Sequence, residues 1–414
     1  MKNFINFHIL ISHSPSCLNR DDMNMQKSAV FGGERRVRIS SQSLKRAIRK
    51  SEYYRQHLGE ASIRSRDLEL LKDEFLEQLG DEFKEETIKE ALERFAKTKS
   101  SEDEDDDIQE EGDSEKGTVK KIAVAPWITD EFKVICQIVK EVRDVGLSSE
   151  EEEKAKQVFE KQKGKKKKPL ENFIDAAFGK KIDKQLETNR EALLKAIGSA
   201  VDVALSGRMA TAGLMSTIDG SLAVAHVLTT HSVDSDIDWF TAVDDLQELG
   251  SGHLDTQEFS SGVFYRYASL NLRQLQVNLG LLPDMKSPET KASRERALEI
   301  AVHLLHMLAT VVPSAKQQTF AAHNLADLAM VSFSDIPVSL ANAFEKSIRS
   351  YNGSGFKEPS INALHTYWQQ VHSGYGLTER CGEFLLGQAE VPSDILPKKT
   401  LEELKTWVRS NGEG

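Results

Sequence analysis

The sequence predicts an α+β fold, in which a sheet carries helices packed on one side. Residues 3–12 alternate apolar and polar side chains, which is typical of a half-buried strand. Residues 35–39 alternate in the same way and run directly into a helix whose first turn Ser40 and Ser41 are placed to cap. From about residue 60 to residue 200 the spacing of apolar residues becomes helical.

Length and charge set the first limits on function. A chain of 414 residues is long enough for two domains, or for one domain with large insertions. Its net charge of -11 argues against a nucleic-acid binder. The charge is unevenly spread, however, because residues 1–50 hold ten lysines and arginines against three acids. This distribution fits one positive groove on an otherwise acidic surface.

The use of cysteine and the apolar runs predict a cytoplasmic protein. Cys17, Cys136 and Cys381 are far apart and form no C-x-x-C pair, so neither a disulfide framework nor a cysteine zinc site is expected. The first residues alternate like a strand rather than a signal peptide. The longest apolar run is broken by His303 and His306, and we therefore expect no membrane-spanning segment.

The basic segment 35–50 organises the chain. Arg36 and Arg38 alternate with two apolar residues, which predicts a strand with one basic face. In the helix that follows, Leu44 and Ile48 lie one turn apart and should face inward. Four cations rise beside them in two columns with i to i+4 spacing: Lys45 with Arg49, and Arg46 with Lys50. Backbone N–H groups, hydroxyls and positive charges would then converge at the start of this helix, where they could bind phosphate oxygens. A basic face that is simply solvated is an equal alternative.

Two low-complexity blocks interrupt the helical region. Residues 101–115 contain ten acids, and residues 154–168 contain eight lysines. Neither block can bury apolar surface, so both are expected to be solvated loops or disordered insertions. The lysine run could contact nucleic acid, but a flexible solvated arm is the favoured interpretation.

The second half of the chain predicts further strands and helices. Strands are expected over 222–230, 258–271 and 328–333. Helices are expected over 291–311, from Pro337 to Arg349, over 360–373 and over 400–410. The last of these helices opens on a capping box from Thr400 to Glu403.

One group of residues could carry catalysis. A histidine and three aspartates could hold the divalent ions of a metal-dependent nuclease: His231, Asp234, Asp236 and Asp238. Acids at alternate positions of an exposed ribbon are more often solvated or salt-bridged, so we favour that interpretation. His303 and His306 lack a third ligand and are expected to be core or boundary residues. No nucleotide-binding loop or hydrolase motif occurs elsewhere.

Trp239 and Phe240 lie next to these acids, flanked by turn-forming residues. On a projecting hairpin, such an aromatic pair could stack on bases or wedge between them. Simple burial explains the pair equally well, so the pattern leaves both interpretations open.

Several segments carry a family pattern: 4–27, 35–50, Ser206-Gly-Arg-Met-Ala-Thr211, 233–247, 257–268, 342–346 and 404–413. They closely resemble the CasC proteins (the Cas-seven family), which form the backbone of Cascade, the type I-E CRISPR surveillance complex. The resemblance spans most of the chain. Two departures are the low-complexity blocks between 98 and 168, and Gln318, which stands where the family has an arginine.

The resemblance implies a fold with three parts. A palm resembling an RRM (ferredoxin-like) domain would comprise residues 1–59, a strand at 222–232 and residues 264–414. Helical fingers would be inserted at 60–221, with the low-complexity block at 98–168, and a β-hairpin thumb would occupy 233–263.

The resemblance also implies a function without catalysis. The chain would bind guide RNA (crRNA) and polymerise head to tail along the guide spacer. It would present the guide for pairing with target DNA in antiviral defence, together with other Cascade subunits and a separate helicase-nuclease, without a cofactor, a metal or a membrane. Alternatives from other classes are the metal-dependent single-strand ribonuclease described above and a protein-interaction scaffold without nucleic acid.

The resemblance finally implies the residues that touch RNA. One group would lie along the phosphates at the helix opened by Ser40: Arg20, Lys27, Arg38, Ser40, Gln42, Lys45, Arg46 and Arg49. A second group would fold over a kinked nucleotide: Met209, Phe240, Thr241 and Leu254, with Trp239 in the same motif. Contacts to phosphates rather than to base edges suit a protein that must accept any guide sequence.

Overall fold

The computed structural model describes residues 2–96, 125–160, 169–209, 217–243, 251–351, 353, 355–387 and 389–413. The chain divides into two compact units. The first unit comprises Met1–Glu60, Ser221–Val277 and Leu281–Gly414, and the second comprises Ala61–Gly220 with Asn278–Gly280. The assignment of palm, fingers and thumb to residue ranges stays a prediction.

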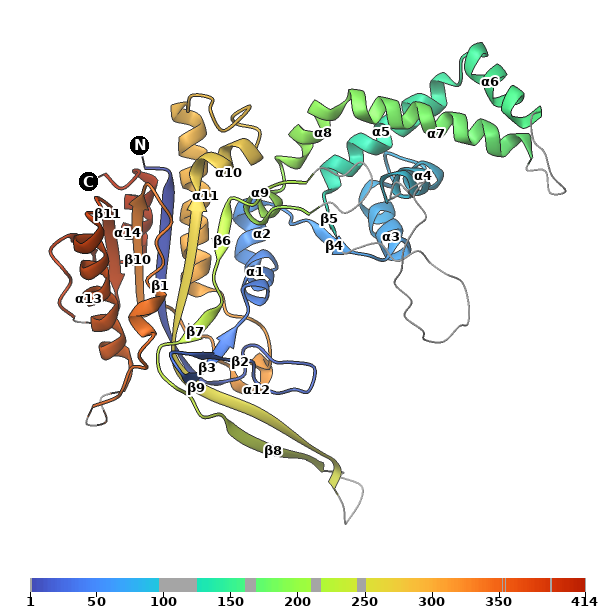
Figure 1. The fold of residues 1–414 in the computed structure, drawn as a ribbon. Coiled ribbons are helices and arrows are strands. Elements are labelled where there is room, and N and C mark those ends of the chain that lie inside the picture. The colour runs from blue at the N-terminus through green and yellow to red at the C-terminus, as the bar shows by residue number, and fades with distance from the viewer. Residues whose placement is uncertain are drawn as a thin grey trace. The chain divides into compact units, whose positions relative to one another are not determined.

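The first unit has a mixed α and β architecture (Figure 1). Its strands are β1 (Phe4–Ser16), β2 (Ser28–Phe31), β3 (Glu34–Ile39), β6 (Leu222–Val224), β7 (Val227–Thr229), β8 (Asp236–Val243), β9 (Ser251–Asn271), β10 (Leu328–Ser334), β11 (Arg380–Leu385) and β12 (Ile395–Lys398). Its helices are α1 (Ser41–Arg49), α2 (Glu52–Leu58), α10 (Leu272–Asn278), α11 (Lys291–Thr310), α12 (Gln317–Phe320), the 3₁₀ helix η1 (Ala341–Phe344), α13 (Lys357–Tyr375) and α14 (Leu401–Arg409).

All ten of these strands belong to one sheet. The order is β12-β11-β10-β1-β9-β7-β3-β2, and β6 and β8 also pair with β9. β1 lies at the centre, because Phe4 pairs with Ser334 on one side and with Asn271 on the other. The predictions of strands near 3–12 and 328–333 are confirmed.

Helices cover both faces of this sheet, so the prediction of helices on one side is wrong. On one face, Leu364 and Trp368 of α13 pack in a core with Leu10 and Met330. On the other, the ring of Trp407 in α14 meets the ring of Phe333 edge-on at a centroid distance of 5.6 Å. Every residue of β10 is buried, and a strand buried on both faces reads as a continuous apolar run.

A buried arginine joins β9 to the end of α11. Arg266 is 1% exposed, and its Nη1 donates hydrogen bonds to the carbonyls of Leu308 and Val311, each at 2.9 Å. These carbonyls belong to the last turn of α11, where intrahelical donors run out. Burial lowers the pKa of Arg266 to about 10, so the guanidinium stays charged at neutral pH.

The predicted strand at 222–230 is interrupted. β6 pairs Val224 with Ala268, and β7 pairs Leu228 with Tyr265, so the register against β9 shifts by one residue between them. This shift is that of a bulge, which re-aims the side chains within it. His226 lies in the interruption.

The predicted helix from Pro337 to Arg349 is reduced to η1. Arg36 explains why, since its Nη2 donates to the carbonyls of Phe344 at 3.2 Å and Glu345 at 3.3 Å, where a continuing helix would place N–H groups. The turn between β2 and β3 also approaches this segment closely. Gly32 has a φ of 60°, and a Cβ at this position would collide with the carbonyl of Glu345.

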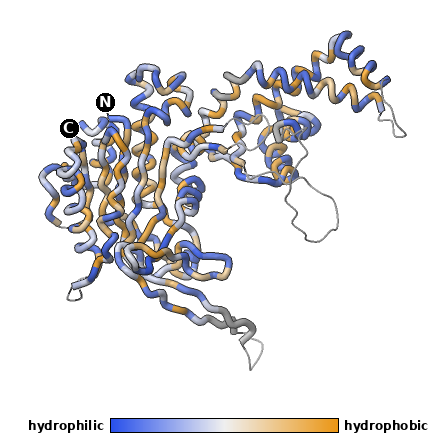
Figure 2. Tube along the Cα trace, viewed as in Figure 1, coloured by the Kyte–Doolittle hydropathy of each residue, from blue (hydrophilic) through white to orange (hydrophobic). Residues whose placement is uncertain are grey.

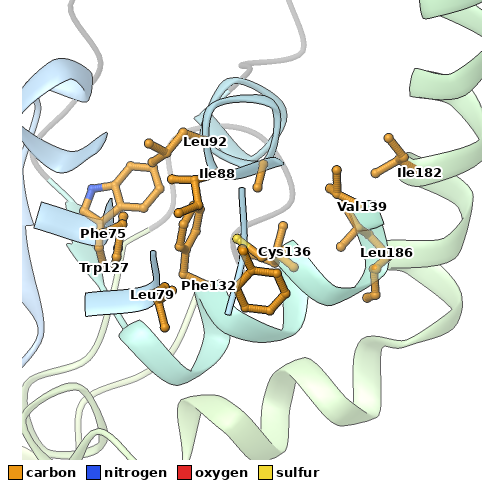
Figure 3. Packing of buried hydrophobic residues seen from close by; sticks show 14 of the residues in the cluster. Phe75, Leu79, Ile88, Leu92, Trp127, Phe132, Cys136, Val139, Ile182 and Leu186 are labelled. Atoms are coloured by element: carbon orange, nitrogen blue, oxygen red, sulfur yellow. The ribbon is translucent and has the colours of Figure 1, made fainter. Parts of the chain in front are cut away.

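The second unit is mainly helical, as predicted for residues 60–200. Its elements are β4 (Ile63–Ser65), α3 (Leu68–Leu79), α4 (Glu85–Ala96), β5 (Ala125–Trp127), α5 (Thr129–Val145), α6 (Ser149–Glu160), α7 (Leu170–Thr188), α8 (Arg190–Ile197) and α9 (Val201–Ser206). Figure 3 shows its core, where the rings of Phe75 and Phe132 stack with centroids 4.0 Å apart. Ile182 and Leu186 of α7 complete the same cluster.

The low-complexity blocks fall partly outside the described residues. The acidic block 101–115 and the second part of the lysine-rich block, residues 161–168, lie outside the described residues. The first part of the predicted lysine-rich loop is instead helical, because 154–160 belongs to α6. A half-buried face explains the helix: Ala155 is buried, and Phe159 packs edge-on against Phe173 of α7 at 6.0 Å. Every helix in the described segments is too short or too polar to traverse a lipid bilayer.

Arg208 and Glu131 form a buried ion pair in the second unit. The side chains are 0% and 3% exposed, and the two N–O distances are 2.6 Å and 3.0 Å. Burial raises the pKa of Glu131 even though the hydrogen bonds from Arg208 act in the opposite direction. The effect of desolvation on the pKa of Glu131 is therefore larger than that of its hydrogen bonds with Arg208.

We predict that Glu131→Leu lowers the free energy of unfolding by about 3–5 kcal/mol, because Arg208 then loses its buried counter-charge. Glu131→Leu combined with Arg208→Met should recover most of that loss, since neither charge is left in the interior. Urea unfolding followed by circular dichroism measures both. A double variant that is no more stable than the single variant would contradict this explanation.

Candidate nucleic-acid interface

The interface begins at the N-terminus of α1. Ser40 has extended backbone angles (φ -67, ψ 145), and its hydroxyl accepts a hydrogen bond from the N–H of Ser43 at 3.2 Å. The predicted cap is confirmed. It satisfies one of the donors that every helix N-terminus leaves open.

Two residues that the sequence did not indicate hold the neighbouring donors. The side-chain oxygen Oδ1 of Asn19 accepts from the N–H of Ser40 at 2.9 Å. Nδ1 of His226, in the bulge between β6 and β7, accepts from the N–H of Ser41 at 3.1 Å. Gln42 is exposed, and its N–H lies in the first turn of α1, where no intrahelical acceptor is available. This donor is therefore available to an anion.

The cations of α1 stand beside its buried stripe, as predicted. Leu44 is 0% and Ile48 is 6% exposed. The cations are half-buried or exposed: Lys45 and Arg49 are half-buried, and Arg46 and Lys50 are exposed. The helix contains no acid, so its own ionisable side chains carry only positive charge. Figure 2 shows α1 as a largely hydrophilic helix beside the hydrophobic sheet.

The loop 17–27 brings three further predicted residues to this helix. The N–H of Lys27 donates to the carbonyl of Asn19 at 2.9 Å, and the N–H of Arg38 donates to the carbonyl of Lys27 at 2.8 Å. Arg20 follows Asn19 directly and is exposed. The Nε atom of Arg38 is buried and has no partner among the described residues. Arg20, Lys27 and Arg38 thus gather near the cap of α1.

The predicted basic face of β3 is only partly correct. Arg36 is 0% exposed and donates to the carbonyl of Thr229 at 3.2 Å, besides its bonds to the segment of η1. Arg36 therefore stabilises the fold and is not accessible to a ligand. Arg38 is half-buried, and Arg35 is exposed. Alternation alone could not indicate this, because the face on which Arg36 lies is covered by Thr229 and by the segment around η1.

The predicted hairpin is present, and Figure 1 shows β8 and the first half of β9 projecting from the sheet as an arm. Trp239 is 66% exposed and Ile237 is 55% exposed. Burial of Trp239, one of the two interpretations of the aromatic pair, is therefore wrong. The backbone register pairs Thr241 with Leu254. The side chains of Phe240, Thr241 and Leu254 lie outside the described residues.

Met209 lies in the second unit, where its side chain is 84% exposed. Its neighbour Arg208 is buried in the ion pair with Glu131. An exposed methionine directly after a buried arginine is available for apolar contact with a ligand. Met209 and α1 belong to different units.

The candidate metal cluster is not assembled. Among the described residues, no group of three or more histidine, cysteine, aspartate or glutamate side chains is placed to hold a metal ion. Nε2 of His231 accepts from the N–H of Val263 at 3.2 Å, and its Nδ1 bonds the carbonyl of Ser232 at 2.9 Å. Both ring nitrogens are therefore engaged. Asp238 accepts from Gln257 at 3.0 Å.

Comparison with solved structures shows the fold. A chain of a "CRISPR RNA-guided surveillance complex, pre-nicking" matches with a TM-score of 0.72 and 24% identity, covering 99% of this chain and 100% of that chain. A chain of another "CRISPR RNA-guided surveillance complex" matches with a TM-score of 0.55 and 20% identity, covering 99% of each. At these identities the likeness establishes a shared fold.

Comparison by sequence gives the family. No curated protein matches significantly. The model of the family described as "CT1975-like protein" matches residues 5–409. With the structural likeness, this match supports the resemblance to a Cas-seven-type subunit. Because the family model covers nearly the whole sequence, this chain belongs to the CT1975-like protein family.

Proposed function

We propose that this chain is a non-catalytic subunit that binds guide RNA and forms the backbone of a CRISPR surveillance complex. The observation that carries the proposal is the N-terminus of α1. The helix holds three cations and no acid, and a fourth cation, Lys50, follows at its C-cap. Arg20, Lys27 and Arg38 lie near its N-cap. The solved structures that this chain resembles belong to RNA-guided complexes, which supports the same role.

The chemistry of this site suits a sugar-phosphate backbone. Phosphate oxygens accept from backbone N–H groups, hydroxyls, lysines and arginines, and such contacts carry no information about the base. A subunit that must accept any guide has to bind RNA independently of base sequence, because the sequence is read by base pairing. Ser40, Gln42, Lys45, Arg46 and Arg49 would contact successive phosphates.

The hairpin would act on the bases. An exposed tryptophan on a projecting arm offers a flat apolar face, and such faces stack on every base. Trp239 would stack on or wedge beside a nucleotide, and Phe240, Thr241 and Leu254 would enclose it. Met209, in the second unit, would also contact RNA. Repeated in each copy of the chain, the arm would interrupt the guide at regular intervals.

The finer features of the proposal extend the same role. The complex would be type I-E Cascade, and copies of the chain, with an RRM-like palm, would polymerise head to tail along the guide. Other subunits would complete the complex, which would pair the guide with target DNA and hand it to a separate helicase-nuclease in the cytoplasm. The chain itself would need no cofactor or metal. The matched chains come from RNA-guided surveillance complexes, which supports a role in a complex with guide RNA.

We predict that Lys45→Ala with Arg49→Ala weakens binding of single-stranded RNA and lowers the salt slope of binding by about 1.4, because each lost phosphate contact removes about 0.7 of a counterion. Fluorescence anisotropy with a labelled RNA at several salt concentrations measures both quantities. Lys291→Ala with Arg296→Ala is the matched control, since it removes two exposed cations from α11 of the same unit. An unchanged slope in the α1 variant would count heavily against the site.

We predict that Trp239→Ala weakens RNA binding by about 1–3 kcal/mol, the typical contribution of one stacked base, and leaves the salt slope unchanged. RNA should also quench the tryptophan fluorescence of the wild-type protein. Trp127, Trp368 and Trp407 are 1%, 1% and 4% exposed, so the quenching should disappear in the variant. Quenching that persists without Trp239 would show that RNA binds elsewhere.

We predict that single-stranded RNA stays intact when it is incubated with the purified protein and magnesium or manganese. Both nitrogens of His231 are engaged within the fold, which leaves the nearby aspartates without a histidine partner for a metal. Gel electrophoresis of the RNA provides the measurement. Cleavage that Asp236→Ala abolishes would favour the ribonuclease instead.

A further inference from the structure

Glu258 is an unexpected residue at the base of the hairpin. It lies on β9 opposite Ile237, and it is 7% exposed. A buried carboxylate loses much of its hydration, and in a region proposed to hold RNA it also repels the ligand. Such a residue needs a structural role. Its Oε2 accepts a hydrogen bond from the backbone N–H of Gln26 at 2.9 Å, and Gln26 is 5% exposed.

Gln26 belongs to the same loop, 17–27, whose other end is fixed to α1. Asn19 accepts from the N–H of Ser40 through its side chain and from the N–H of Lys27 through its carbonyl, each at 2.9 Å. The loop therefore has one attachment at the phosphate-binding helix and one at the hairpin. Asn19 provides the first, and Glu258 provides the second.

The two attachments are joined directly, because Lys27 bonds Asn19 and Arg20 forms a β-bridge with Gln26, and further hydrogen bonds hold the tip of the loop. Oδ1 of Asp21 accepts from the N–H groups of Met23 and Met25, each at 2.9 Å. Asn24 takes a left-handed conformation (φ 64), which asparagine tolerates better than most residues, and its side chain accepts from Arg20. A loop that is held internally transmits a displacement from one end to the other.

Opposite charges gather around the hairpin base. Burial raises the pKa of the Cys17 thiol, and four nearby charges act on the same thiol: Arg20, Lys316, Glu258 and Asp21. The base is also covered by α12, where the ring of Phe320 lies 5.6 Å from that of Phe259. The base of the hairpin is therefore packed against α12.

We propose that Asn19 and Glu258 are positioning residues that make the loop 17–27 a fixed spacer between α1 and the hairpin. Contact of a phosphate with the helix and stacking of a base on Trp239 then strengthen one another. Once one contact has formed, a rigid spacer makes the other contact intramolecular. The effective concentration for that second contact falls when the spacer becomes flexible. This inference rests on the proposed function.

A double-mutant cycle tests the coupling, with the full-length chain and a labelled single-stranded RNA of mixed sequence. Glu258→Ala should weaken binding, reduce the RNA-induced quenching of Trp239 and leave the salt slope unchanged. Trp239→Ala should cost at least about threefold less affinity in the Glu258→Ala background than in the wild type. Asn19→Ala should behave like Glu258→Ala. Glu258→Gln should retain the coupling, since its amide oxygen still accepts from Gln26.

A control and a second measurement separate positioning from charge or misfolding. Glu390→Ala removes an exposed acid from the same unit and should change none of these quantities. Hydrogen exchange should accelerate at the amide of Gln26 in Glu258→Ala and at that of Ser40 in Asn19→Ala, while the remaining core stays protected.

The outcomes distinguish this inference from the function on which it rests. Tighter RNA binding by Glu258→Ala would show that the acid acts only by repulsion, and independent effects of Glu258 and Trp239 would show that the spacer couples nothing. Either result overturns the inference and leaves RNA binding intact. A wild-type protein that ignores RNA at low salt overturns both.

Discussion

The first unit depends on the bond between Arg266 and the end of α11. From the last third of β9, this one guanidinium donates to the carbonyl of Leu308 in the last turn of α11 and to that of its C-cap residue, Val311. Because β9 continues without a break from the sheet into the hairpin, fixing Arg266 also fixes the register of the arm. A slip of one residue would turn Arg266 to the opposite face and leave both the cation and the carbonyls unsatisfied.

Three buried arginines differ from the cations around the cap of α1 in both burial and partners. Arg36, Arg208 and Arg266 are at most 2% exposed and bind carbonyls or a carboxylate. Burying a guanidinium group is costly unless its donors meet acceptors, and here the terminal nitrogens do so, while the Nε atoms of Arg36 and Arg266 have no partner among the described residues. The cations around the cap of α1 face solvent in part, and an anionic ligand can reach them.

Local chemistry made much of this arrangement predictable. The cap at Ser40, the inward stripe of Leu44 and Ile48, and the strand at Phe4–Ser16 each follow from residues that are adjacent or one turn apart. The roles of Asn19, His226 and Glu258 did not follow, because their partners lie 21, 185 and 232 positions away. Of these three, only Asn19 carried a signal, since it stands in a loop rich in turn-forming residues.

The errors have the same origin. Arg36 was assigned to an exposed basic face because alternation reports two faces of a strand but not what covers each one. The helix expected after Pro337 had acceptable propensity, and the guanidinium of Arg36 competed for its carbonyls from a distant strand. Sequence patterns thus predicted the helices and strands that depend on neighbouring residues. They did not predict the segments whose structure depends on a polar contact with a residue far away in the sequence.

The burial of the three cysteines has a practical consequence for spectroscopy. Each thiol is at most 4% exposed, and burial raises the pKa of all three, that of Cys136 to about 12. Alkylating reagents attack the thiolate, so the folded chain should resist them as if it contained no cysteine. A single cysteine introduced at an exposed position of the arm would then accept a dye or spin label alone, and distances to the arm could be measured without first removing the native thiols.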